Sequence, residues 1–94
     1  MDVTYRIDKD IIYIAVEGRI DASNAAEAEE KIFGIKNDNP GKHTVLDADK
    51  LEYISSAGLR VILRLRKEEP KLAIINVAPD VYEVFDMTGF TDMV

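Results

Sequence analysis

The hydrophobic positions of this chain fall into short runs with two different periodicities. Residues 3–7 alternate apolar and polar side chains, as a half-buried strand does. Residues 11–16 are β-branched and almost continuously apolar, which predicts a strand that is buried on both faces. Asp8-Lys9-Asp10 lies between them and has turn composition, and Gly18 closes the second run. We therefore expect an N-terminal β-hairpin.

Helical periodicity follows the hairpin. An apolar stripe recurs at three- and four-residue spacing and predicts an amphipathic helix that ends at about Ile35. Ser23 or Asn24 is suited to be its N-cap, because either side chain can accept a hydrogen bond from the first turn. Residues 37–41 (NDNPG) have loop chemistry. The stripe consists of Ala25, Ala28, Ile32 and Ile35.

The remaining chain alternates strand and helix. We expect a strand over residues 43–48, a helix from about Ala57 to Glu69, and a strand over residues 72–77. Pro79 is favoured at the first position of a helix and starts the last one, whose apolar residues are Val81, Val84, Phe85 and Met87. The order β-β-α-β-α-β-α predicts one α/β domain over residues 1–94, with a mixed, mostly parallel β-sheet and the first strand as an antiparallel addition.

Composition limits the function classes. The chain has 94 residues and no cysteine, which excludes a disulfide scaffold, thiolate metal ligands and a cysteine nucleophile. Its 12 Lys and Arg against 18 Asp and Glu give a net charge of -6, which argues against broad nucleic-acid binding because that needs basic surface. No apolar run approaches the roughly 20 residues of a membrane span. Residues 1–10 lack the charge order of a signal peptide, so we expect a cytoplasmic protein.

The stretch of residues 42–67 joins a short apolar run to a strongly apolar helical run. Its connection is the polar turn Tyr53 to Gly58 (YISSAG), which places serines and a glycine where a strand gives way to a helix. A serine hydrolase of the nucleophile-elbow type would need G-x-S-x-G, but position 54 is Ile. The single histidine, His43, lies at the opposite end of the preceding strand. We therefore do not expect an enzyme.

Other site chemistries have little support. Neither G-x-G-x-x-G nor a P-loop occurs, so no loop is ready to hold a nucleotide. Asp47 and Asp49 would share one face of a strand, yet no histidine or third acid joins them in sequence. A solvated turn at Asp49-Lys50 is the simpler interpretation. We assign no metal and no cofactor.

The serines at the helix start allow two interpretations. Ser55 or Ser56 can serve only as the N-cap, which is the commonest role of a serine there. Alternatively, one of them is a phosphorylation site. A phosphate carries about -1.5 to -2 charges and is favoured by the exposed N–H groups and the positive dipole end of a helix. Physical chemistry alone favours the cap.

Three segments of this chain resemble one known family. The signature of the STAS domain (sulfate transporter and anti-sigma factor antagonist) is a strand ending in Asp, a D-S-[ST/A]-G-L turn and a helix. Residues 45–63 of this chain resemble this signature and read VLDADKLEYISSAGLRVIL. The family's G-x-[LI]-D-x segment is similar to VEGRIDASNAAEAEEKI, and its closing strand, helix and T-G-[LF] turn are similar to INVAPDVYEVFDMTGF. The resemblance covers nearly the whole chain and implies a STAS-like fold.

The resemblance also implies a function. Stand-alone domains of this type are typically anti-sigma factor antagonists that act by partner switching. The unphosphorylated form binds an anti-sigma factor that is also a serine kinase. Phosphorylation by that kinase breaks the complex, and a PP2C-type phosphatase restores it. Ser56 is the implied phosphoacceptor, with Ser55 as the second choice, and Ser55 stands where phosphorylated members usually carry Asp.

The expected partner-binding surface combines two segments with the basic line of the second predicted helix. Gly58 permits close backbone approach at the turn, and Asp21 matches the acidic residue of the G-x-[LI]-D segment. On a chain of net charge -6, the line of Arg60, Arg64 and Lys67 either is an ordinary solvated face or steers an acidic partner. The whole expected surface is Asp21, Ser23, Ser55, Ser56, Ala57, Gly58, Leu59, Arg60 and Arg64.

A second role stays open for the same domain. Family members also act as accessory subunits of membrane transport systems, where they bind an ATPase without being phosphorylated, or as scaffolds in sensory assemblies. The serine at position 55 makes such a non-switching adaptor more plausible. A kinase or phosphatase gene beside this one would favour the switch, and a transport ATPase gene would favour the adaptor.

Overall fold

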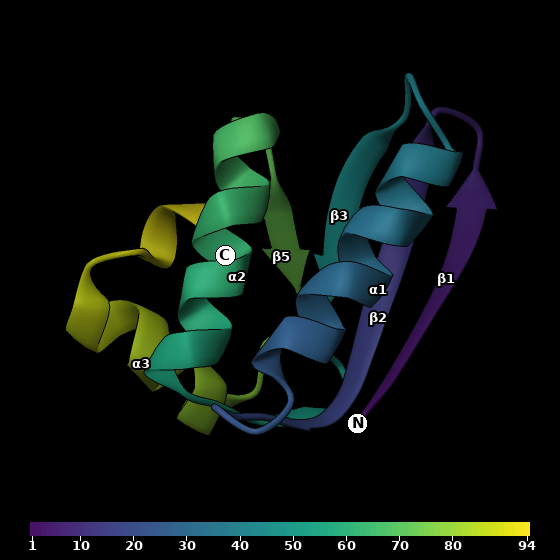
Figure 1. The fold of residues 1–94 in the computed structure, drawn as a ribbon. Coiled ribbons are helices and arrows are strands. Elements are labelled where there is room, and N and C mark those ends of the chain that lie inside the picture. The colour runs from purple at the N-terminus through teal and green to yellow at the C-terminus, as the bar shows by residue number, and fades with distance from the viewer.

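A computed structural model describes all residues, Met1 to Val94, and shows a five-stranded sheet with three α-helices and a short C-terminal 3-10 helix. The elements appear in Figure 1. In chain order they are β1 (Asp2–Asp8), β2 (Ile11–Ile20), α1 (Ala25–Asp38), β3 (His43–Asp47), β4 (Leu51–Ile54), α2 (Ser56–Glu68), β5 (Ala73–Ile75), α3 (Pro79–Thr88) and the 3-10 helix Thr91–Met93.

The sheet has the expected mixed character. Its strands are ordered β1-β2-β3-β5, with β1 antiparallel to β2 and the later strands parallel to their neighbours. This confirms the α/β class, the element order and the antiparallel first strand. One strand is additional: β4 pairs in parallel with the end of β2, beyond a register shift between Gly18 and Arg19.

Strand β4 corrects the expected turn at Tyr53–Gly58. Tyr53 and Ile54 belong to β4, Ser55 alone separates the elements, and α2 begins at Ser56. The four residues of β4, LEYI, have a buried, exposed, exposed, buried pattern that matches neither alternation nor a continuous apolar run. Pairing with β2 creates this strand, because local sequence pattern alone would leave it as a turn.

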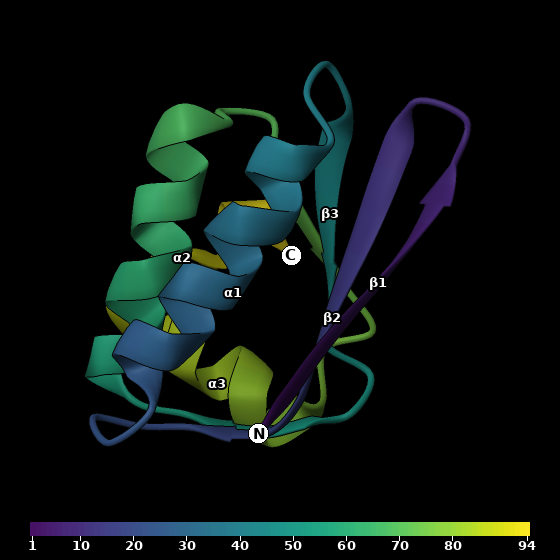
Figure 2. The same cartoon turned by 45° about the vertical axis from the view of Figure 1, so that its right-hand side comes forward.

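All three helices cover the same face of the sheet, as the two views of Figures 1 and 2 show. The prediction that residues 11–16 are buried on both faces is therefore wrong. Ile12, Ile14 and Val16 point towards the helices and are buried, whereas the alternate side chains of β2 are only partly covered. The run is continuously apolar although no helix covers the second face of β2, which is partly exposed.

The last helix differs from its prediction at one side chain. Val81 and Phe85 are buried and Val84 packs against the core, but Met87 is 79% exposed and belongs to the outer surface. Pro79 lies in the first turn as expected, and Gly89 ends the helix in the left-handed conformation with φ of 80°. None of the helices has the length and apolar character required to cross a membrane.

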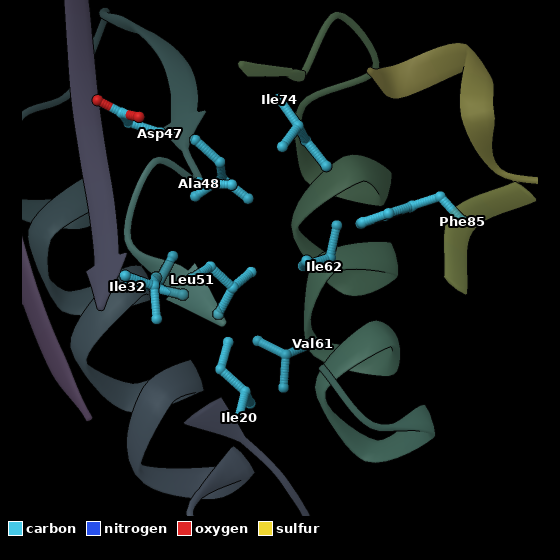
Figure 3. Close-up of a pocket in the computed structure, with 11 residues that line it drawn as sticks. Ile20, Ile32, Asp47, Ala48, Leu51, Val61, Ile62, Ile74 and Phe85 are labelled. Carbon is cyan, nitrogen blue, oxygen red and sulfur yellow. The ribbon is translucent and has the colours of Figure 1, made fainter. Parts of the chain in front are cut away.

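The core contains one small void, which Figure 3 shows. It measures about 20 Å³ and lies between the sheet and the helices, and 10 of its 11 lining residues are hydrophobic. The carboxylate of Asp47 points away from the other side chains (Figure 3). A void of this size and apolarity offers a water molecule too few polar partners and a substrate no room. Any functional site must therefore be on the surface.

Candidate functional site

The β2–β4 pairing brings the two expected site segments together. Ile20 lies opposite Ile54 in the parallel register, and the N–H of Ser55 donates to the carbonyl of Ile20 at 2.9 Å. The residues that follow the two strands, Asp21 and Ser56, consequently emerge at the same end of the sheet. Segments that are about 35 positions apart in the sequence thus form one surface.

Gly58 holds the start of α2 against this strand pair. A Cβ built on Gly58 would lie 2.8 Å from Ile20 Cγ2 and 2.8 Å from Ile54 Cγ1. Both isoleucines are 1% exposed, so neither can move away without disturbing the core. Only glycine fits here, and the expectation of a close backbone approach is confirmed by these distances.

The two serines have different local roles. Ser55 is the N-cap of α2, in extended conformation, and its hydroxyl oxygen accepts from the N–H of Gly58 at 3.3 Å. Ser56 is the first helical residue and is exposed, and no hydrogen bond of its side chain is found. The N–H groups of the first helical residues have no acceptor within the helix, and the Ser55 hydroxyl supplies one for Gly58. Of the two hydroxyls, that of Ser56 is thus the exposed one without a hydrogen bond.

Replacement of the cap provides a test of this division. Ser55→Ala is expected to lower the free energy of unfolding by about 1 kcal/mol because the first turn loses its side-chain acceptor. Ser55→Asp should retain the stability, since a carboxylate caps equally well and interacts favourably with the helix dipole. Urea denaturation measures both. The matched control is Ser56→Ala, which should change the stability by less than about 0.5 kcal/mol; equal losses for the two alanine variants would contradict the assignment.

Asp21 is the centre of a hydrogen-bonded turn between β2 and α1. Its Oδ1 accepts from the hydroxyl of Ser23 at 2.5 Å and from the N–H of Ser23 at 2.9 Å. Its own N–H donates to Oδ1 of Asn24 at 2.9 Å, and the amide of Asn24 donates to the carbonyl of Arg19 at 2.8 Å. Asn24 precedes α1 as expected, but its side chain fastens this turn instead of capping the helix. These hydrogen bonds fix Asp21 directly after Ile20, whose carbonyl accepts from the N–H of Ser55.

These hydrogen bonds set the ionisation of Asp21. Hydrogen bonds from the Ser23 hydroxyl and then from the Ser23 N–H lower the pKa of Asp21 most, burial opposes them more weakly, and the positive charge of Arg19 adds a still smaller lowering effect. Because the folded-state pKa is below the unfolded value, the ionised carboxylate stabilises the fold fully above the unfolded pKa. That contribution is lost as the pH falls through the folded pKa.

Removal of the hydroxyl should therefore be visible in a titration. We expect Ser23→Ala to raise the pKa of Asp21, because the first of its stabilising donors is lost. The acid-induced loss of stability would then begin at a higher pH. The carboxyl carbon shift of Asp21, followed by NMR against pH, measures the change. Ser23→Thr keeps the hydroxyl and should keep the low pKa; a titration curve unaltered in Ser23→Ala would show that this hydrogen bond is unimportant.

Only part of the expected line of basic side chains on α2 is without an ion pair. Arg64 forms an ion pair with Glu29 of α1 at 2.5 Å, so its guanidinium is engaged within the chain. Arg60 is exposed, has no ion pair and lies one helical turn from Ser56. The structure thus separates two arginines that the sequence treats alike. Arg60 remains a candidate for partner contact, whereas Arg64 ties α2 to α1.

Arg19 and Tyr53 form a feature that the sequence did not reveal. The guanidinium carbon of Arg19 lies 4.3 Å from the centre of the Tyr53 ring, and the two residues are register partners in β2 and β4. Tyr53 is 39% exposed, so an aromatic face and a positive charge adjoin the Asp21 turn. No signal in the sequence could have shown this pair, because it depends on recognising β4.

The side chains considered for catalysis lie elsewhere or are engaged in structure. His43 starts β3, opposite Ile11 at the amino end of β2, and its Nδ1 is 3.5 Å from a carboxylate oxygen of Glu69. Asp47 accepts from the side chain of Asn76 at 3.0 Å and from the N–H of Asp49 at 3.1 Å, and so secures the loop that leads to β4. Neither residue faces the two serines.

Sequence comparison finds a relative in Bordetella bronchiseptica. A candidate anti-sigma factor antagonist of Bordetella bronchiseptica, BtrV, is 34% identical to this chain over 84 residues, which span 85% of this chain and 72% of BtrV. The sequence model of the STAS domain matches residues 2–94.

Solved structures share the fold. An anti-sigma factor antagonist from Mycobacterium paratuberculosis superimposes with a TM-score of 0.84 at 20% identity, covering 97% of this chain and 80% of that chain. The anti-sigma factor antagonist SpoIIAA in its unphosphorylated form gives a TM-score of 0.76 at 18% identity, covering 98% and 84%. With a family model that matches all but the first residue, this chain belongs to the STAS domain family.

Proposed function

We propose that this chain is an anti-sigma factor antagonist that works by partner switching. In its unphosphorylated form it binds an anti-sigma factor through the surface around Asp21 and Ser56, so that the sigma factor is set free. Phosphorylation of Ser56 adds a charge in the middle of that surface and releases the anti-sigma factor. The similarity to BtrV supports this class of partner.

One observation carries the proposal. Ser56 is an exposed, unbonded hydroxyl at the first position of α2, on the same surface as the rigid Asp21 turn. Its neighbour Ser55 already caps the helix, so modification of Ser56 leaves the cap intact. A phosphate there would lie near the positive end of the helix dipole and one turn from the unpaired Arg60. The fold can therefore accept the modification while its surface charge changes sharply.

The remaining roles in the proposed cycle belong to other proteins. In this cycle Ser56 accepts the phosphate, and other proteins transfer and remove it. We propose that the anti-sigma factor is itself the serine kinase and that a PP2C-type phosphatase regenerates the free hydroxyl. In this cycle the chain is a substrate and a binding module, and its phosphorylation state decides whether it stays bound.

The direct test is phosphorylation in vitro. The wild type, Ser55→Ala and Ser56→Ala are incubated with ATP and the candidate kinase, and the phosphate is located by mass spectrometry. We expect modification of the wild type and Ser55→Ala but not of Ser56→Ala. Phosphate on Ser55 alone would overturn the choice of residue. Tight binding without phosphate on either serine would favour a non-switching adaptor, with a transport ATPase as a possible partner.

Arg60 should influence how fast the partner binds. Arg60→Glu reverses an unpaired surface charge next to Ser56, so association with the anti-sigma factor is expected to slow by about tenfold at low salt. Stopped-flow association at several ionic strengths measures this. The free energy of unfolding should change by less than about 0.5 kcal/mol because no ion pair is lost.

The control for Arg60 is Lys71→Glu, an equal charge reversal at an exposed residue beyond the end of α2. Its association rate should stay near that of the wild type. Arg64→Glu is a poor probe, since it would also break the ion pair with Glu29. Equal slowing by Arg60→Glu and Lys71→Glu would remove Arg60 from the proposed surface and leave only the effect of net charge.

A further inference from the structure

The outer edge of β1 is an open strand edge. β1 has seven residues and pairs only with β2, whereas the strands at the other margins, β4 and β5, have four and three. Figures 1 and 2 show β1 at the margin of the sheet with no element beyond it. Alternate residues of β1 therefore turn their N–H and C=O groups outward, where another strand can bind them.

β1 lacks several of the features that protect edge strands, although Asp2, Arg6 and Asp8 are charged. Its sequence, DVTYRID, has no proline or lysine, and its register with β2 runs without a bulge. Tyr5 and Ile7 lie on the helix-covered face, opposite Ile14 and Ile12, yet they are 52% and 44% exposed. Val3 on the same face packs against the core. An apolar strip thus continues from the core to the open edge.

We propose that β1 pairs antiparallel with β1 of a second copy of this chain, around a two-fold axis at Thr4. In this register Asp2 lies opposite Arg6 of the other copy, and the symmetry repeats this attractive pair. Val3 lies opposite Tyr5, also twice, so apolar side chains meet on the helix-covered face. Each of these cross-strand pairs stabilises an antiparallel ladder.

Other registers of the same two strands are less favourable. Even-numbered residues must oppose even-numbered ones, because a shift by one residue would place apolar side chains against the polar face. A two-fold axis at Tyr5 would set Asp2 against Asp8, and one at Arg6 would set two arginines against each other. Like charges directly opposite one another destabilise a strand pair. An axis at Ile7 would pair Arg6 with Asp8 attractively, but only residues 6–8 of β1 would then overlap. Charge and the length of the overlap together therefore select the axis at Thr4.

The proposed dimer is independent of the partner-switching surface. β1 contributes no residue to the turn of Asp21 or to the start of α2. Two copies joined at β1 form one continuous sheet, and each copy keeps its own exposed Ser56. The dimer would thus present two switching sites at once, and it can be tested without knowing the anti-sigma factor.

A disulfide trap tests the axis. The chain has no cysteine, so Thr4→Cys introduces a single thiol. Residues opposite each other in an antiparallel pair have Cα atoms about 4.5–5.5 Å apart, within the range of about 4.4–6.8 Å that disulfides need. Mild oxidation should convert most of Thr4→Cys to a covalent dimer. Asp8→Cys lies on the same face but outside the overlap and should remain mainly monomeric; equal dimer formation by the two variants would overturn the proposal.

Charge exchange tests the pairing by sedimentation. Asp2→Arg and Arg6→Asp should each raise the dimer dissociation constant by about tenfold or more, because both symmetric pairs become repulsive. An equimolar mixture should dimerise again, since each variant then faces opposite charges. Asp8→Arg is the control and should dimerise as the wild type does, and circular dichroism verifies the fold of each variant. A wild type that is monomeric up to about 1 mM, or an Asp2→Arg variant that dimerises more tightly, would refute this register.

Discussion

Gly58→Val is expected to destabilise the fold by about 3 kcal/mol or more, a large part of the roughly 5–15 kcal/mol that stabilises a typical domain. The first added carbon already lies 2.8 Å from two buried isoleucine side chains, and valine adds two more methyl groups at the same place. Ile20 and Ile54 are β-branched and have few alternative rotamers, so the strain must move α2 away from the sheet. Chemical denaturation or thermal melting measures the loss.

A second glycine of the chain gives the matched control. Gly34 is also inside a helix, but no atom lies within 4 Å of a Cβ built there. Gly34→Ala should therefore stabilise the protein by up to about 1 kcal/mol through helix propensity, whereas Gly58→Ala should destabilise it by about 1–3 kcal/mol. Effects of the same sign and size would show that the contact of Gly58 with the two isoleucines carries no strain.

Most of the fold could be predicted because its signals are local. The hairpin turn at Lys9, the amphipathic face of α1 and the proline at the start of α3 each leave a periodic or compositional pattern. Strand β4 could not be predicted, since its four residues become a strand only by pairing with β2. The half-open face of β2 was missed for a related reason. An apolar run shows that a strand is partly buried, but it does not show whether helices cover one face of the sheet or both.

The candidate site was predictable in its parts and not in its assembly. The resemblance singled out Asp21 and Ser56, and neither composition nor spacing could tell that their segments meet. The assignment of the cap to Ser55 also required the structure, because both serines are acceptable caps by residue type. The Arg64–Glu29 ion pair is likewise invisible in the sequence, as it joins two helices.

The structure changes the meaning of serine at position 55. The family's usual aspartate would cap the helix as Ser55 does, because its side-chain oxygen can also accept a hydrogen bond from the first turn of α2. The substitution therefore leaves the geometry at Ser56 intact. What it removes is a negative charge beside the proposed acceptor hydroxyl, so we expect its effect on the rate of phosphorylation rather than on folding.

Phosphorylation of Ser56 is expected to weaken binding of the anti-sigma factor by about a hundredfold or more. A dianionic group that is buried in the complex without a complementary charge on the anti-sigma factor costs several kcal/mol, and each 1.4 kcal/mol is a factor of about ten. Ser56→Asp should reproduce only part of this, about tenfold, because a carboxylate carries less charge and is smaller. Calorimetric titration of the wild type, the phosphorylated protein and Ser56→Asp measures the series.

The control for that series is Asn37→Asp, which adds one negative charge at an exposed residue near the far end of α1 and should leave affinity within about twofold. The phosphorylated protein should keep its stability, since the new charge lies at the positive end of the α2 dipole. Loss of binding together with loss of folding would make the release an unfolding effect. Unchanged affinity of a fully phosphorylated, folded protein would refute the switch, because the charge would then lie outside the interface.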